Sequence, residues 1–253
     1  MSDGLIWGSG GALMGAIIGS FLGALCLRWP RGDSVARGRS HCDACGAGIA
    51  AHDLIPIVSF IVRRGRCRMC GEAIDHTHLW IELGAAMIGG MAFSLFPPQQ
   101  AAAIALLGWL LLVLAWFDAR HFWLPDPLVG GLAAAGLLLG DMVSGAALVD
   151  RLAGAFAGGL SLALIAALYR RARGRDGLGG GDPKLFAALG CWLGWAMLPP
   201  LLLIASVLGL GWATVQMLRG GTLTATARLP LGTLLAAAVP LTLILWPRLI
   251  SGS

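Results

Sequence analysis

The sequence predicts an all-α polytopic membrane protein with about eight transmembrane helices, and three observations support this prediction. Hydrophobic residues make up 57% of the 253 residues and charged residues only 12%, roughly half the charge of an ordinary soluble domain. The apolar residues gather in runs of about 20, the length that crosses a bilayer. Lysine and arginine lie almost entirely between these runs. Because so few charges could not cover a soluble surface, the composition excludes a secreted enzyme, a nucleic-acid-binding protein and a disordered tail.

Eight apolar segments are the candidate spans, and two proline pairs separate four of them. One pair follows Phe96 and the other follows Leu198. Because proline cannot continue a helix through its interior, each pair predicts a hairpin. The first segment lacks a basic start and a small-residue cleavage site, so we expect it to be a retained span. The expected spans are 5–27, 79–96, 100–117, 127–147, 150–168, 183–198, 199–218 and 229–246.

The basic residues predict which loops face the cytoplasm. Sixteen Lys and Arg residues fall on the side of the loop 28–78, and two, Arg151 and Arg248, fall on the other side. Because cytoplasmic loops carry the excess of positive charge, this bias places 28–78 in the cytoplasm and both termini outside. The same bias accounts for the net charge of +5 without a nucleic-acid partner.

Glycine recurs every four residues in the first span, at Gly11, Gly15, Gly19 and Gly23. Residues four apart share one face of a helix. In lipid, a face of small residues lets two helices approach closely. We therefore expect this face to serve packing rather than catalysis.

The long loop 28–78 holds two C-x-x-C pairs, each followed by a glycine, with 21 residues between them. Pairs at this separation are typical of tetrahedral zinc sites, in which four thiolates close the coordination shell. Disulfides fit poorly because the cytoplasm is reducing. The loop is poor in apolar residues, so we expect structural zinc to supply much of its stability. The four predicted ligands are Cys42, Cys45, Cys67 and Cys70.

Two aspartates are expected to meet at the cytoplasmic edge of the membrane. Asp118 ends the third span and Asp182 opens the sixth, so the topology places both at one depth. Two carboxylates that share a proton can activate water as a base and donate a proton as an acid. The glycines before Asp182 would let a substrate strand approach the backbone closely. These glycines are Gly179, Gly180 and Gly181.

Helix capping is an alternative interpretation of Asp182 and of Asp126, because a proline follows each of them. An aspartate at the cap with proline at the first helical position is an ordinary helix start. Lys184 could also simply neutralise Asp182. If the dyad does form, the helix dipoles predict that Asp118, at a helix C-terminus, holds the shared proton and that Asp182 is the anion.

These motifs resemble those of the type IV prepilin leader peptidases, a family of membrane aspartic peptidases with a Gly-x-Gly-Asp signature. Residues 179–185 (GGGDPKL) are similar to that signature and its continuation. Residues 118–126 (DARHFWLPD) are similar to the other aspartate motif of the family, and residues 65–71 (GRCRMCG) to its second cysteine pair. Glu82 falls where the family has an acid. The resemblance covers nearly the whole chain, in the same order.

The resemblance implies two reactions at the cytoplasmic face of the bacterial inner membrane. Asp118 and Asp182 would cleave the basic leader of type IV prepilin or pseudopilin precursors after a glycine. An N-terminal region, 1–98, with its zinc loop would methylate the new amino terminus with S-adenosylmethionine, and 99–253 would form the peptidase core. Glu82 is the one candidate for cofactor binding. The residues expected to support the substrate are Gly179, Gly180, Gly181, Lys184 and Asp126.

Three alternatives remain at this point. The chain departs from the family at Leu54-Ile55-Pro56, where the family reads Asn-Ile-Pro, and at Thr77-His78-Leu79, where it reads Arg-Tyr-Pro. These departures favour a peptidase with a degenerate methyltransferase region as one alternative. A proton-coupled transporter that relays protons through its aspartates is another, and a membrane-tethered zinc module is the third. The sequence does not distinguish a pilus from a secretion pseudopilus.

Overall fold

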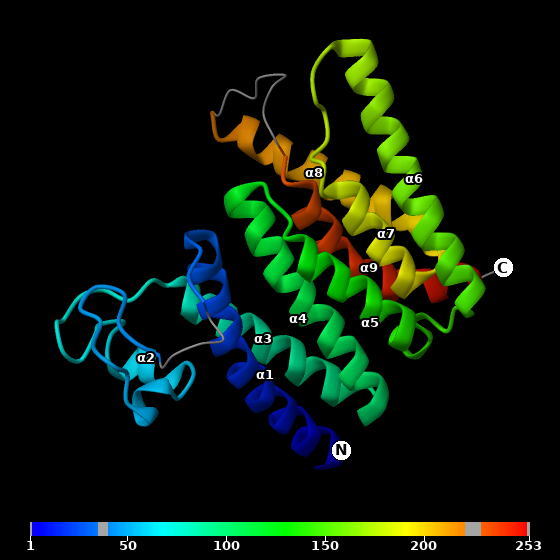
Figure 1. Ribbon diagram of the computed structural model, residues 1–253. Coiled ribbons are helices and arrows are strands. Elements are labelled where there is room, and N and C mark those ends of the chain that lie inside the picture. The colour runs from blue at the N-terminus through cyan, green and yellow to red at the C-terminus, as the bar shows by residue number, and fades with distance from the viewer. Residues whose placement is uncertain (1, 35–39, 221–228, 252–253) are drawn as a thin grey trace. The chain divides into compact units, whose positions relative to one another are not determined.

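A computed structural model describes residues 2–34, 40–220 and 229–251 of the chain (Figure 1). Within these ranges the secondary structure consists of helices joined by loops and turns, with two isolated β-bridges in the cysteine loop. The chain divides into two compact units, residues 1–113 and 114–253. The long helices are α1 (Ser2–Arg28), α3 (Thr77–Leu95), α4 (Pro98–His121), α5 (Asp126–Ser144), α6 (Leu148–Arg173), α7 (Asp182–Leu193), α8 (Leu198–Leu218) and α9 (Leu231–Ser251). The short ones are η1 (Trp29–Arg31), η2 (Ala51–Leu54), α2 (Val58–Val62) and η3 (Trp195–Met197).

The all-α membrane fold is confirmed, but a count of eight spans is not. Each predicted apolar segment forms a helix, and six helices in the described ranges are long and apolar enough to cross a bilayer: α1, α3, α4, α5, α6 and α8. Helix α7 has 12 residues, about 18 Å at 1.5 Å per residue, against a hydrocarbon core of about 30 Å. The described apolar part of α9 is also short, Leu231–Trp246. The chain is a multi-pass membrane protein whose α7 does not meet the length for a span.

In the first unit, α1 packs along α3 through its glycine face, as the four-residue spacing predicted. A Cβ on Gly11 would lie 2.5 Å from the carbonyl oxygen of Gly89, and one on Gly19 would lie 2.7 Å from the Cα of Glu82. Side chains at these positions would push the two helices apart. The contact fixes Glu82, which is buried, against α1.

In the second unit, α7 is packed between α5 and α6 (Figure 1). Trp192 of α7 is fully buried, and its Nε1 donates to the carbonyl oxygen of Leu132 in α5 at 2.8 Å. The hydroxyl of Ser144 donates to the carbonyl oxygen of Trp192, also at 2.8 Å. On the α6 side, Gly190 and Gly154 bring the two backbones into direct contact. Helix α7 is therefore a short internal helix that is held between α5 and α6.

The two proline pairs act differently. Helix α3 ends at Leu95 and α4 begins at Pro98, so the first predicted hairpin is confirmed. The second break lies earlier than predicted: α7 ends at Leu193, η3 follows, and α8 already begins at Leu198 with prolines in its first turn. Proline is tolerated there because the first helical N–H groups have no partner within the helix.

Candidate active site

Asp118 lies in the last turn of α4 and is buried, with 5% of its surface exposed. Its Oδ2 accepts the backbone N–H of Thr233 at 2.7 Å. The hydroxyl of Thr233 lies 3.1 Å from the same oxygen and 3.0 Å from the carbonyl oxygen of Ala115. The start of α9, 115 residues further along the chain, therefore holds one oxygen of this carboxylate.

Asp182 is the first residue of α7 and is also buried, at 6% exposure. Its Oδ2 accepts the N–H of Gly179 at 2.9 Å, upstream of the helix. A capping carboxylate would instead accept an N–H of the turn that follows it, so Asp182 does not cap α7 in the ordinary way. Nor does Lys184 neutralise it, because the Lys184 Nζ lies 2.7 Å from Oδ1 of Asp126.

The second unit brings the two carboxylates within electrostatic reach of each other. Burial, and then the charge of Asp118, raise the pKa of Asp182 to about 6. Leu124 lies beside a glycine next to each aspartate, since a Cβ on Gly181 would be 2.9 Å from its Cβ and one on Gly232 would be 3.3 Å from its Cδ1. Two buried carboxylates that share a site are expected to hold one proton between them near neutral pH.

The three predicted glycines have different surroundings. A Cβ on Gly179 would lie 3.1 Å from Oδ2 of Asp182, and one on Gly181 would collide with Leu124. Nothing lies within 4 Å of a Cβ placed on Gly180. Gly179 and Gly181 are thus needed for packing around the aspartate, and Gly180 leaves backbone open to an approaching strand.

The sequence reasoning did not find Gly232 and Thr233. A Cβ on Gly232 would lie 3.0 Å from both Cγ and Oδ2 of Asp118, so the glycine permits the close contact. The only signal in the sequence is an ordinary helix start, Pro230 followed by an apolar run. It predicts α9 but not which side chain its first turn meets.

The four predicted zinc ligands come together in the first unit. Their sulfur atoms all lie within 4.8 Å of one another, and Cys42 Sγ lies 3.9 Å from Cys70 Sγ. Tetrahedral coordination with Zn–S bonds of about 2.3 Å requires sulfur separations of about 3.8 Å. All six cysteines of the chain lie in the described ranges, and none forms a disulfide. The donor set fits a tetrahedral thiolate-bound metal.

The two cysteine pairs are built alike. The N–H of Gly46 donates to the carbonyl oxygen of Cys42 at 2.9 Å, and that of Gly71 to Cys67 at 3.0 Å. Both glycines have positive φ, +69° and +73°, a conformation that a residue with a Cβ rarely adopts. The glycine after each pair therefore closes the tight turn that two adjacent ligands require.

The electrostatics of this cluster favour binding of a cation. Backbone N–H groups of Cys70 and Met69 lower the pKa of Cys67 to about 6, which favours its thiolate. For Cys70, the N–H of Glu72 acts in the same direction, but burial and hydrogen bonds to the other three thiols raise its pKa to about 12. A divalent metal removes the repulsion between neighbouring thiolates.

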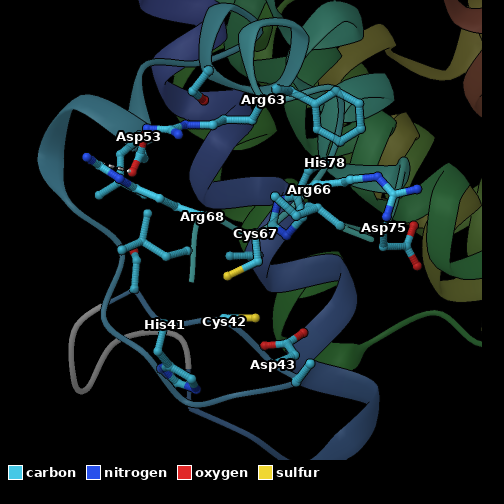
Figure 2. A pocket seen from close by; sticks show the side chains of 18 of the residues that line it. His41, Cys42, Asp43, Asp53, Arg63, Arg66, Cys67, Arg68, Asp75 and His78 are labelled. Carbon is cyan, nitrogen blue, oxygen red and sulfur yellow. Dashed lines mark hydrogen bonds and ion pairs between the residues drawn. The ribbon is translucent and has the colours of Figure 1, made fainter. Parts of the chain in front are cut away.

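A cavity of about 760 Å³ lies beside the cysteines in the first unit, within the range of small-molecule sites. Figure 2 shows the sulfur atoms of Cys42 and Cys67 pointing toward one another at its wall, with Arg63 against Asp53. Arg63 makes two hydrogen bonds to Oδ1 of Asp53, at 3.0 and 2.8 Å. Glu82 also lines the cavity.

Glu82, which lines the cavity, also holds a strained residue of the loop. Its Oε2 accepts the N–H of Ile57 at 2.7 Å. Ile57 has φ +63°, which is rare for a β-branched residue and typical of functional sites. The departure Leu54-Ile55-Pro56 comes directly before this residue, so it lies in the same loop as the Glu82 contact.

Comparisons with known proteins agree with both halves of the chain. Residues 13–96 match the bacterial peptidase A24 N-terminal domain, and residues 105–214 match the type IV leader peptidase family. A prepilin leader peptidase/N-methyltransferase of Klebsiella pneumoniae is 39% identical over 212 residues, which is 79% of this chain and 91% of the relative. No solved structure matches the chain.

Other relatives with the same name are longer. One of Burkholderia pseudomallei (strain 1026b) is 40% identical over 206 residues, 81% of this chain and 66% of the relative. One of Pseudomonas aeruginosa is 39% identical over 202 residues, 79% of this chain and 69% of the relative. The chain thus spans about two thirds of the length of these relatives. Their names favour neither a transporter nor a non-enzymatic zinc module. The chain belongs to the type IV leader peptidase family, as the sequence motifs predicted.

Proposed function

We propose that this protein cleaves the basic leader of type IV prepilin or pseudopilin precursors and then N-methylates the new amino terminus. Membership of the family supports this reading, and so do the names of the relatives. The single observation that carries it is the pair of buried aspartates in the second unit, with Asp182 responding to the charge of Asp118.

In the proposed cleavage, the dyad carries one proton. The ionised aspartate takes a proton from water, whose oxygen bonds to the scissile carbonyl carbon, and the protonated aspartate gives its proton to the carbonyl oxygen. Collapse of the tetrahedral intermediate returns the first proton to the leaving amide nitrogen and breaks the C–N bond. The acidic partner recovers its proton from the intermediate, so the dyad ends as it began.

The open backbone at Gly180 supports binding of the precursor as an extended strand. Lys184 and Asp126 support this site indirectly, because their ion pair ties the start of α7 to the start of α5. The exposure of both side chains makes this pair a positioning contact of small energy. The distribution of basic residues supports cleavage at the cytoplasmic edge of the bacterial inner membrane.

The first unit is the proposed methyltransferase region. S-adenosylmethionine, when bound, supplies the methyl group that the new N-terminal amine takes. The cavity beside the cysteines has a suitable size and carries carboxylates and guanidinium groups for a zwitterionic ligand. Glu82 would hold it with the oxygen that Ile57 does not use, and His78 lines the same wall. Zinc on the four cysteines would fix the two turns that bound the cavity.

Cleavage by the full chain in proteoliposomes tests the proposal. The substrate is a synthetic precursor with a basic leader, a glycine junction and an apolar helix. We expect Asp118→Asn and Asp182→Asn each to lower kcat by on the order of 10³-fold. Asp141→Asn is the matched control, because Asp141 is an exposed aspartate of α5 away from the dyad. If both dyad variants cleave as fast as the parent, the peptidase proposal is wrong.

Mass spectrometry of the processed product tests the second reaction. A methylated amino terminus in the presence of S-adenosylmethionine is the expected result. An unmodified terminus on fully cleaved product would show that the departures at 54–56 and 77–79 have ended methylation in this chain.

A further inference from the structure

The two carboxylates of the dyad are held by unequal sets of donors. Asp118 accepts the N–H of Thr233 at 2.7 Å, and the Thr233 hydroxyl lies 3.1 Å from the same oxygen and 3.0 Å from the carbonyl oxygen of Ala115. Asp182 accepts the N–H of Gly179 at 2.9 Å. An N–H group can only donate, so each one favours the ionised form of the carboxylate that it faces.

The start of α9 can donate to Asp118 because the N–H groups of its first turn have no partner within the helix. The first hydrogen bond inside α9 joins the N–H of Leu234 to the carbonyl oxygen of Pro230, at 3.2 Å. The N–H groups of Gly232 and Thr233 precede it and have no partner within the helix. The positive end of the α9 dipole therefore faces Asp118 and opposes the negative end of α4, on which Asp118 lies.

Among the residues that the structure describes, no other charge near the dyad reverses this difference. Lys184, two residues into α7, is paired with Asp126 of α5. Arg120 and His121 follow Asp118 on α4 and are exposed. The described residues of α9 up to Trp246 carry no charged side chain. The charge that acts on Asp182 is that of Asp118.

We infer that Thr233 is a positioning residue that keeps Asp118 ionised, so that Asp182 carries the proton of the resting dyad. Asp118 is then the base that takes the proton from water, and Asp182 is the acid that protonates the carbonyl oxygen. This order is the reverse of the one expected from the ends of α4 and α7 alone, because the start of α9 supplies a second and opposite dipole. The inference rests on the proposed peptidase function.

Removing the hydroxyl of Thr233 tests the inference, because the direction in which the pH profile shifts depends on which aspartate holds the proton. If the hydroxyl donates to an ionised Asp118, removing it makes Asp118 easier to protonate. The acidic limb of the pH profile then moves to higher pH. If the hydroxyl donates to the carbonyl oxygen of Ala115 and accepts from a protonated Asp118 instead, removing it makes Asp118 easier to ionise, and the acidic limb moves to lower pH. The isosteric variant Thr233→Val removes the hydroxyl and keeps the backbone N–H.

The experiment measures kcat/KM of the full chain in proteoliposomes against pH, with the synthetic precursor. For Thr233→Val we expect the acidic limb to shift to higher pH by about one unit, because one hydrogen bond to a charged group is lost. At a given pH on that limb, kcat/KM should fall about 10-fold. Thr233→Ser, which keeps the hydroxyl, restores the parent profile. Thr242→Val is the matched control, since Thr242 is fully buried in the same helix and its hydroxyl bonds to Ala238 of that helix at 2.9 Å.

The inference is wrong if the acidic limb of Thr233→Val moves to lower pH or does not move. A shift of equal size in Thr242→Val does so too, because the effect would then be a general consequence of losing a hydroxyl from α9. Failure of the proposed function is a separate outcome: it is recognised by full cleavage in Asp118→Asn and Asp182→Asn.

Discussion

The close contact between the backbone of Gly232 and the side chain of Asp118 allows us to predict the effect of one added methyl group, in the variant Gly232→Ala. The new Cβ would lie 3.0 Å from Cγ and Oδ2 of Asp118 and 3.3 Å from Cδ1 of Leu124. Ordinary van der Waals contact begins at 3.4 Å, so the carboxylate and the start of α9 must separate by about 0.4 Å. Leu124 blocks part of the space into which α9 could otherwise tilt.

The separation weakens the hydrogen bond that holds Asp118. The distance between the Thr233 nitrogen and Oδ2 is 2.7 Å, and the shift would lengthen it to about 3.1 Å, near the limit for N–H···O bonds. A hydrogen bond to a charged group contributes about 1.5–3 kcal/mol. Losing about 1–2 kcal/mol of that in the transition state lowers kcat about 5- to 30-fold. Alanine favours helix over glycine by about 1 kcal/mol, which offsets the strain, so the melting temperature should change little.

Cleavage of the synthetic precursor in proteoliposomes measures the first effect, and thermal unfolding in detergent measures the second. Gly211→Ala is the control, because nothing lies within 4 Å of a Cβ at this position of α8. It should leave kcat unchanged. If Gly232→Ala is folded and cleaves within about twofold of the parent, below the smallest loss expected here, the contact between α9 and Asp118 does not matter for catalysis.

Two further predictions concern pH and metal. The pKa of Asp182 is raised to about 6 in the folded state from an ordinary value of 3.8, so its ionisation opposes folding progressively as pH rises from about 4 to 6. Asp182→Asn should therefore raise the melting temperature more at pH 7.5 than at pH 4.5. An equal change at both pH values would contradict the burial argument. Cys67→Ser should reduce bound zinc from about one per chain toward zero, as measured by elemental analysis, because a tetrahedral site loses one of its four ligands. Cys26→Ala, which changes a buried cysteine of α1, should keep the metal. Full zinc retention in Cys67→Ser would exclude Cys67 as a ligand.

The helices were predictable from the sequence because apolar length and proline position are local properties. Helices α1, α3, α4, α5, α6 and α8 follow directly from them. The length of α7 could not be predicted in the same way, since the apolar run that contains it continues into η3 and α8. Whether a long apolar run crosses the membrane or turns inside the protein depends on its neighbours. Here α5 and α6 bury most of α7, and the chain turns at Gly194.

The clustering of the four cysteines was predictable because the spacing of the two pairs determines the local geometry. Two cysteines separated by two residues, followed by a glycine, can form only a few local structures. The two turns at Gly46 and Gly71 are nearly identical, and the 21 residues between the pairs need only be long enough to bring them together. The cavity beside the cysteines was not predicted, because it depends on how η2 and α2 fold back toward Glu82.

The aspartate site shows where reasoning from one element at a time reaches its limit. The residues Asp118 and Asp182 could be selected, since buried carboxylates at the membrane edge are rare. Their hydrogen-bond partners could not, because Thr233 is 115 residues from Asp118 in the sequence and carries no feature of a catalytic residue. A dipole argument that considers only the helix bearing each aspartate then assigns the proton to Asp118. Adding the start of α9 reverses the inferred assignment, because the N–H of Thr233, which has no partner within its own helix, bonds to Asp118 and so favours the ionised form of that carboxylate.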